Sequence, residues 1–318
     1  MPLTHKKGST DGTPRALRLT QLAARLRNGD RVALAKGISL AENDPARASK
    51  LMGLLRPTGR TFVVGVTGPP GTGKSTLVDK LIDSFRGRGL KVGVIAVDPT
   101  SPITGGALLG DRIRMTGHSS DKGVYIRSMA SRGWTGGLSR ATSQVIQLMD
   151  AAGFDLVLLE TVGIGQSDIE VVGVSHAVLV VLMPGLGDDI QVSKAGLMEV
   201  GDVYVVNKSD LAGADTMIVS LLGLFRGSSR TPSVLKVSAI SGDGIDKLEG
   251  AIESIRSRFT KGNQELRLKS IRGMIVETAR ASAMRKFAQA SDVRADRLAR
   301  QVLAGKMTVE AAAARLEK

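Results

Sequence analysis

The run FVVGVTGPPGTGKS, residues 62–75, decides the fold of this chain. It begins with a Val-rich segment typical of a β-strand and continues into a glycine-rich turn that matches the pattern G-x-x-x-x-G-K-[ST]. A helix is expected from Thr76, so the turn lies between a strand and a helix. The pattern therefore predicts a loop whose backbone N–H groups bind phosphate, assisted by the positive end of the helix dipole.

The residue types in this loop indicate a nucleoside triphosphate with Mg²⁺ as the ligand. Lys74 is expected to reach the β- and γ-phosphates, and the Ser75 hydroxyl is expected to ligate Mg²⁺. The residues expected to contact phosphate are Gly68, Gly71, Thr72, Gly73, Lys74, Ser75 and Thr76.

Further apolar runs predict the rest of a sheet. They are continuously apolar rather than alternating, which is typical of strands that are covered on both faces. The expected fold class is therefore α/β, with a mostly parallel sheet, helices on both sides, and the ligand at the carboxyl ends of the strands. The runs are residues 92–97, 156–159, 177–183, 203–206 and 233–237.

Two of these runs end in a carboxylate. Asp98 follows the second expected strand and Glu160 follows the third, and Mg²⁺ prefers oxygen ligands of this kind. Both are candidate metal ligands, and the alternative for each is a structural role as a helix N-cap. Gly163 lies shortly after Glu160 and is a candidate backbone donor to the γ-phosphate.

The fifth expected strand is followed directly by the tetrad N-K-x-D. Asp210 can accept from N1–H and the N2 amino group of guanine, whereas adenine would leave the carboxylate unpaired. Asn207 can contact the opposite edge of the base, and the stem of Lys208 can lie against its plane. After the sixth strand, backbone groups of Ser238 and Ala239 can contact the guanine oxygen. Together these residues predict GTP rather than ATP as the ligand.

The sequence divides into three parts by its patterns. Residues 1–60 predict an N-terminal helical extension, residues 61–258 a P-loop domain, and residues 259–318 a C-terminal helical extension. Within the first part, Asp44 precedes a proline, which is a typical start of a helix.

The two extensions carry the excess positive charge of a chain whose formal net charge is +14. Such flanks are either solvated helix faces or surfaces for an acidic partner or nucleic acid. The C-terminal extension also has an apolar helical stripe, which either the P-loop domain or a second subunit must cover. The stripe consists of Leu268, Ile271, Ile275 and Ala279.

Composition excludes several functional classes. The chain has 0 cysteines, which excludes disulfides, iron–sulfur clusters, thiolate zinc sites and cysteine nucleophiles. Aromatic residues are only 3% of the chain, which disfavours nucleic-acid modules that stack bases. The apolar runs are too short to span a membrane and the first residues lack a signal pattern, so a soluble cytoplasmic protein is expected.

Four stretches resemble the MeaB/ArgK/MMAA family of P-loop GTPases. They are AVDPTSP (96–102), TGGALLGDR (104–112), ETVGIGQS (160–167) and MPGLGDD (183–189), within a resemblance that extends over about residues 20–318. Members of this family are chaperones of adenosylcobalamin-dependent acyl-CoA mutases, above all methylmalonyl-CoA mutase. The resemblance implies a GTPase that uses Mg²⁺, binds GTP and GDP, and gates the loading and protection of adenosylcobalamin, which it meets only through the partner mutase.

Carried over by position, the resemblance also implies site roles. Residues 98–114 would form a first switch, residues 163–170 a second, and residues 184–196 a third that faces the mutase. Residues with Mg²⁺-site or switch roles would be Ser75, Asp98, Asp111 and Glu160, and those serving catalysis would be Lys74, Glu160 and Asp111. Switch and partner contacts would come from Gln166, Asp188, Gln191 and Lys194.

Gln166 is a candidate for orienting the attacking water, and slow turnover without a partner is expected because no base is evident. The C-terminal helices would form a homodimer, as the resemblance implies.

Three other functions compete with this interpretation. The first is a kinase that phosphorylates an amino-acid transport protein, although no motif for a second substrate is evident. The second is a GTPase of the nickel-delivery type, which the absence of cysteine disfavours. The third is a nucleic-acid binder that uses the basic extensions, for which too few aromatic residues are present.

Overall fold

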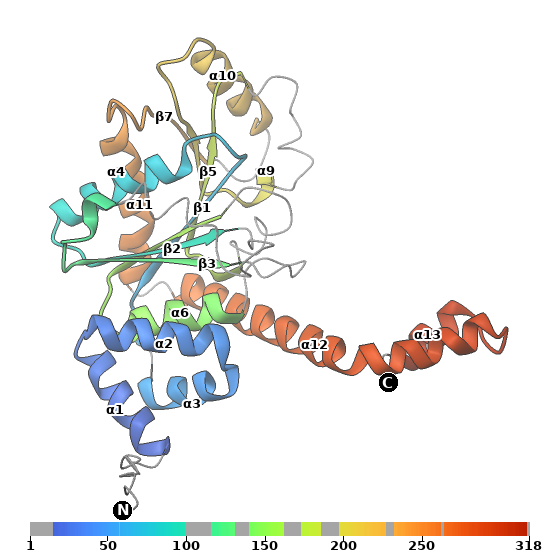
Figure 1. Cartoon of the computed structure of the whole chain (residues 1–318). Helices are drawn as coiled ribbons and strands as arrows, with labels where there is room; N and C mark the ends of the chain where they lie inside the picture. Colours follow the sequence, from blue (N-terminus) through green and yellow to red (C-terminus); the bar gives the residue numbers. More distant parts are fainter. Residues whose placement is uncertain are drawn as a thin grey trace, which may run out of the picture.

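The centre of the molecule is a sheet of seven strands in the order β3-β2-β4-β1-β5-β6-β7 (Figure 1). The computed structural model describes residues 15–56, 58–98, 116–130, 140–161, 173–185, 197–226, 232–261 and 264–316. All neighbouring strands of the sheet are parallel, which confirms the expected fold class. The strands are β1 (Phe62–Thr67), β2 (Val92–Asp98), β3 (Val124–Ala130), β4 (Leu156–Glu160), β5 (Ala177–Leu182), β6 (Val203–Val206) and β7 (Ser233–Lys236).

The apolar patterns of the sequence do not predict β3. This strand lies at the edge of the sheet, next to β2, and has the polar residues Arg127 and Ser128 in its middle. Arg127 forms an ion pair with Glu42 of helix α2 (Arg31–Asn43). Because β3 is an edge strand and its arginine has a charged partner on α2, the strand does not need the unbroken apolar run that marks the central strands.

Helices cover both faces of the sheet. On one face, α4 and α11 pack in a cluster that includes Val64, Val94 and Leu248. On the other face, α6 covers β1, β2 and β4, and α10 covers β5 and β6. The helices of the nucleotide-binding part are α4 (Lys74–Gly87), the short 3₁₀ helix η1 (Thr116–His118), α6 (Arg140–Ala151), α9 (Leu197–Val200), α10 (Ala214–Leu224) and α11 (Ile245–Thr260).

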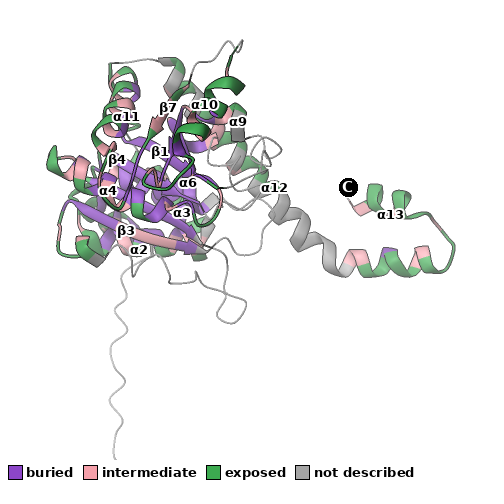
Figure 2. Cartoon of the chain, turned by 90° about the horizontal axis from the view of Figure 1, so that it is seen from above, coloured by how far each residue is buried: buried purple, intermediate pink, exposed green. Residues whose placement is uncertain are grey.

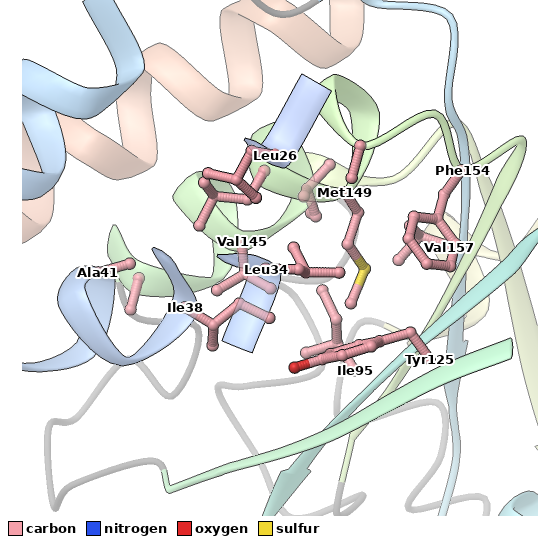
Figure 3. Packing of buried hydrophobic residues seen from close by; sticks show 14 of the residues in the cluster. Leu26, Leu34, Ile38, Ala41, Ile95, Tyr125, Val145, Met149, Phe154 and Val157 are labelled. Carbon is pink, nitrogen blue, oxygen red and sulfur yellow. The ribbon is translucent and has the colours of Figure 1, made fainter. Parts of the chain in front are cut away.

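The N-terminal helices complete the core on the α6 side. They are α1 (Arg15–Arg27), α2 and α3 (Pro45–Leu55), and their buried residues join one cluster with α6 and strands β1, β2, β3 and β4. Figure 3 shows Leu34 of α2 beside Met149 of α6, with Ile95 and Tyr125 beneath them. The expected helix start at Asp44 is confirmed, because its side chain accepts a hydrogen bond from Arg47 N. Residues 15–55 are therefore packed against the sheet rather than standing apart from it.

The C-terminal helices behave differently from the N-terminal ones. Helix α12 (Gln264–Leu303) starts beside α6 and runs away from the rest of the molecule, and α13 (Val309–Leu316) lies beside its far end (Figure 1). The far part of this arm is mostly exposed or half-buried where it is described (Figure 2). In the single chain, the stripe residues Leu268, Ile271 and Ile275 are 59%, 52% and 63% exposed.

A search of the described helices for a membrane-spanning segment gives a negative result, since none of them is both long and apolar enough to cross a bilayer.

Candidate functional site

The phosphate-binding loop lies at the carboxyl end of β1, between that strand and α4. Gly68 and Gly73 have φ angles of 138° and 87°, which L side chains rarely adopt. A Cβ at Gly68 would lie 2.0 Å from the Val181 carbonyl oxygen, and one at Gly73 would lie 2.5 Å from Asn207 Nδ2. Both glycines are therefore required by the loop conformation and by the close approach of β5 and of the residue after β6.

Lys74 starts α4 and has a side chain that is almost fully buried. Its Nζ donates to the carbonyl oxygens of Gly68 and Pro69, at 2.8 and 3.0 Å. The Thr72 hydroxyl donates to the same Pro69 oxygen at 2.9 Å, which closes the loop on itself. The ammonium group is thereby fixed within the loop at the positive end of α4, where a triphosphate would be bound. Thr76 follows in the first turn of α4 and is exposed.

Ser75 and Glu160 bring two oxygen ligands together. The Ser75 hydroxyl donates to Glu160 Oε1 at 2.6 Å, and both side chains are buried. Glu160 ends β4, which lies between β1 and β2, and Ala96 of β2 is its neighbour in the register. Asp98 ends β2 two residues further along, so its backbone lies at the same edge of the sheet. Hydroxyl and carboxylate oxygens are the ligands that Mg²⁺ prefers, so the residues present fit this ion.

Asn207 connects three loops of the site. Its Nδ2 donates to the Thr72 carbonyl oxygen at 2.8 Å, and its Oδ1 accepts from Ala239 N at 3.0 Å. The side chain is 1% exposed, so both of its polar ends are satisfied inside the protein. Asn207 therefore holds the phosphate loop, the end of β6 and the segment after β7 in one arrangement.

The side chain of Ser238 holds Asp210 in place, whereas the sequence predicts only a backbone role for Ser238. The Ser238 hydroxyl donates to Asp210 Oδ1 at 2.8 Å, and Ser238 is 2% exposed. Lys208 has a φ of 53°, in the left-handed region, and its Cε would lie 3.9 Å from a Cβ at Gly73. The tetrad after β6 is thus folded next to the phosphate loop. The orienting role of the Ser238 side chain has no signal in the sequence, because it depends on how two strand ends are placed.

The structure therefore brings together most of the expected phosphate, metal and base residues at one edge of the sheet. For Asp98 only the backbone is described. The remaining expected site residues lie outside the described part of the chain: Asp111, Gly163, Gln166, Asp188, Gln191 and Lys194.

The comparisons with known proteins agree with this geometry. Residues 34–292 match the family model of the methylmalonyl Co-A mutase-associated GTPase MeaB. The chain belongs to this family. The resemblance inferred from the four sequence stretches is thus confirmed, and the chain is a P-loop GTPase of the MeaB family.

Individual MeaB-family relatives extend the comparison. A putative GTPase of Pyrococcus horikoshii is 51% identical over 238 residues, which cover 72% of this chain and 75% of the relative. The GTPase ArgK of Escherichia coli is 39% identical over 255 residues, covering 76% of this chain and 77% of the relative. Among solved structures, one described as a LAO/AO transport system kinase has a TM-score of 0.71 and 25% identity, covering 96% of this chain and 98% of that chain.

Proposed function

We propose that this GTPase requires Mg²⁺ and that its nucleotide cycle gates the loading and protection of adenosylcobalamin in an acyl-CoA mutase, most directly methylmalonyl-CoA mutase. One observation carries the nucleotide part of the proposal: Asn207 joins the phosphate loop to the two strand ends that hold Asp210. The mutase part is supported by the family, whose model is described as associated with methylmalonyl Co-A mutase.

Different residues of the site serve phosphate binding and Mg²⁺ binding. Backbone N–H groups of the loop and the Lys74 ammonium group stabilise negative charge on the phosphates as it shifts toward the leaving group. Mg²⁺, when bound, would supply further stabilisation of negative charge on the phosphates, with Ser75 and Glu160 among the residues that would hold it. Asp98 and Asp111 are the other proposed members of this set.

Base selection rests on Asp210. Its carboxylate would accept from N1–H and the N2 amino group of guanine, and the Ser238 hydroxyl holds it in a fixed orientation. An adenine base would offer this carboxylate no donors, so ATP is rejected because it would leave the Asp210 charge unpaired in the complex.

Transmission to the mutase is assigned to three segments that each follow a strand at the nucleotide edge. Residues 98–114 begin at the last residue of β2, residues 163–170 follow β4 closely, and residues 184–196 follow β5. Loops in these positions can change conformation with the γ-phosphate. In the second segment, Gly163 would donate to the γ-phosphate and Gln166 would contact the water or the partner. The residues proposed to contact the mutase are Asp188, Gln191 and Lys194.

The gating claim is tested by the GTP hydrolysis rate with and without methylmalonyl-CoA mutase. We expect the mutase to raise kcat by about tenfold or more, because a partner that orders the switches completes the site. Lys194→Ala should lose this stimulation while keeping the basal rate, whereas the control Lys80→Ala, on α4, should keep both. Equal rates with and without methylmalonyl-, isobutyryl- and ethylmalonyl-type mutases would contradict the proposal.

We also propose that the chain forms a homodimer through α12. Its Ile271 and Ile275 are exposed in the single chain and line a cavity of about 700 Å³ between α12, α6 and the end of α11. A second copy of α12 would remove this apolar surface from water. Light scattering should give a dimer for the unchanged chain and a monomer for Ile271→Glu, with Val219→Glu on α10 as the exposed apolar control. A monomeric unchanged chain would contradict the dimer.

A second candidate function is a protein kinase. It is favoured by the solved structure described as a LAO/AO transport system kinase. With γ-labelled GTP and the mutase, the proposed GTPase releases the label as free phosphate. A kinase would instead leave the label on a protein.

A further inference from the structure

A cluster of three potential metal ligands lies outside the nucleotide site. Asp79 and Asp83 lie four positions apart on α4, and His118 ends the short helix η1. One ligand atom from each residue lies within 4.8 Å of the other two. Residues four apart on a helix share one face, so both carboxylates point toward the same histidine.

His118 has a carboxylate beside each of its two ring nitrogens. Its Nε2 lies 3.0 Å from Asp79 Oδ1, and its Nδ1 lies 3.9 Å from Asp83 Oδ1. A neutral imidazole carries one N–H, whereas an ionised carboxylate only accepts hydrogen bonds. A neutral ring therefore serves one of the two carboxylates and leaves the other beside a nitrogen lone pair. A cation bound by one ring nitrogen and by both carboxylates would take up a lone pair and compensate both negative charges.

The spacing of the three groups also suits a metal ion. Ligand bonds of about 2.0–2.2 Å place two ligands of one ion ~3 to ~4 Å apart. His118 Nε2 and Asp79 Oδ1 are already at such a distance, 3.0 Å, and the three ligand atoms as a set lie within 4.8 Å of one another. The three side chains differ in how far water reaches them, since those of His118, Asp79 and Asp83 are 11%, 28% and 62% exposed. A metal site that is open to water on one side has ligands with such a range of exposure. Water can therefore complete the coordination from the side of Asp83.

We infer that Asp79, Asp83 and His118 form a second metal site, which takes a divalent first-row transition ion such as Zn²⁺. An imidazole ligand disfavours Mg²⁺, which prefers an all-oxygen shell, and favours ions of the zinc type. The site is separate from the proposed Mg²⁺ site at Ser75 and Glu160, and it exists whether or not the mutase proposal is right.

The position of this site gives it a consequence for the nucleotide-binding part. Helix α4 begins at Lys74 in the phosphate loop, and η1 directly follows residues 99–115, which include most of the proposed first switch. An ion held by both elements ties the end of that segment to the helix that carries the phosphate loop. Zn²⁺ is therefore expected to raise the melting temperature of the chain, since it binds the folded arrangement and not the separated residues.

Titration calorimetry with Zn²⁺ alone tests the inference, on chain stripped of metal and kept in excess Mg²⁺ without nucleotide. We expect one equivalent of Zn²⁺ to bind, Asp83→Asn to weaken it about tenfold or more, and His118→Ala to abolish it. Asp215→Asn, an exposed ion-pair residue on α10, is the matched control and should bind as the unchanged chain does.

Cobalt provides an independent readout of the ligands. Co²⁺ in the unchanged chain should show visible d–d absorption that is absent in His118→Ala, and circular dichroism verifies that the variant is folded. Two results would overturn the site: the lack of saturable Zn²⁺ binding in the unchanged chain, or Zn²⁺ binding in Asp83→Asn and His118→Ala that equals that of the unchanged chain. Either would leave the three residues as an ordinary histidine–carboxylate contact.

Discussion

The two ends of the sheet use polar residues in opposite ways. At the carboxyl ends of the strands, the buried Lys74 and the exposed Asp210 are placed where a nucleotide would meet them, with the buried Asn207 holding the loops together. At the amino ends, Asp150 is buried and His176 is half-buried, and their hydrogen bonds are made with the chain's own backbone and side chains. The difference teaches that burial of a polar group does not by itself mark a functional site. What it contacts decides whether its loss affects activity or stability.

Asp150 is the clearest example of a buried polar residue whose hydrogen bonds all serve the structure of the chain. Its carboxylate accepts from the backbone N–H groups of Gly59, Arg60 and Thr61 and from the hydroxyls of Thr58 and Thr61, at 2.8 to 3.0 Å. Burial raises the pKa of this carboxyl, but the hydrogen bonds lower it by more, so the pKa of Asp150 lies below its ordinary value. Asp150 thus anchors the start of β1 to α6.

His176 lies near Asp150 at the same end. Its Nδ1 accepts from Val63 N at 2.9 Å, and its ring lies 5.5 and 4.1 Å from the rings of Phe62 and Phe259. Burial, with the nearby Arg267 charge, lowers the pKa of His176 to about 4. The folded chain therefore keeps this imidazole neutral over most of the acid range.

The largest expected effect of a substitution is on GTP hydrolysis, at the carboxyl ends of the strands. Lys74→Ala should lower kcat/KM for GTP by about 10³-fold, because it removes the fixed positive charge on the phosphates. The melting temperature should stay near that of the unchanged chain, and Lys80→Ala on the same helix should change neither quantity. Steady-state phosphate release and thermal unfolding measure the two effects. A large loss of stability with retained activity in Lys74→Ala would contradict the assignment of function to the carboxyl end of the sheet and of stability to its amino end.

The next effect is at the amino end and concerns stability. Asp150→Asn should lower the free energy of unfolding by about 3 kcal/mol, because an amide NH₂ replaces an oxygen that accepts from several donors. The matched control Asp155→Asn, whose carboxylate is exposed and accepts from Lys91 N, should cost under ~1 kcal/mol. Urea unfolding measures both, and GTP affinity should remain unchanged in each. A weakened GTP affinity in Asp150→Asn would show that the two ends are coupled.

The smallest effect is a pH dependence set by His176. Its folded pKa of about 4 lies below the ordinary 6.5, so the unfolded chain takes up a proton first as the pH falls. The free energy of unfolding should therefore fall by roughly 2 kcal/mol between pH 6.5 and pH 5. Asp150 does not act in this window, because the stability from its lowered pKa is lost only below its ordinary 3.8.

The variant His176→Asn isolates this contribution. The amide oxygen of asparagine can keep the hydrogen bond from Val63 N but does not titrate. Its stability should be flat over the same pH range, apart from the other titrating groups. An equal slope in the variant and the unchanged chain would assign the dependence to another residue.

The sequence predicts the functional residues at the carboxyl end of the sheet better than the structural ones at its amino end. The phosphate loop and the tetrad ending in Asp210 are recognisable because their residues are adjacent in the chain, and the central strands are recognisable because they are apolar throughout. The hydrogen bonds of Asp150 and Ser238 join residues that are far apart in the sequence, so no local pattern contains them. The edge strand β3 is missed for a related reason, since Arg127 is compensated by Glu42 of a distant helix.

The central claim is that one site binds the triphosphate and selects guanine through Asp210. The most direct test is calorimetry of Asp210→Asn with GTP, xanthosine triphosphate and ATP in the presence of Mg²⁺, with Asp215→Asn as the control. The variant should bind GTP about 10²-fold more weakly and should prefer xanthosine triphosphate, because the amide now donates to the xanthine edge. An unchanged preference for GTP in Asp210→Asn would contradict the claim.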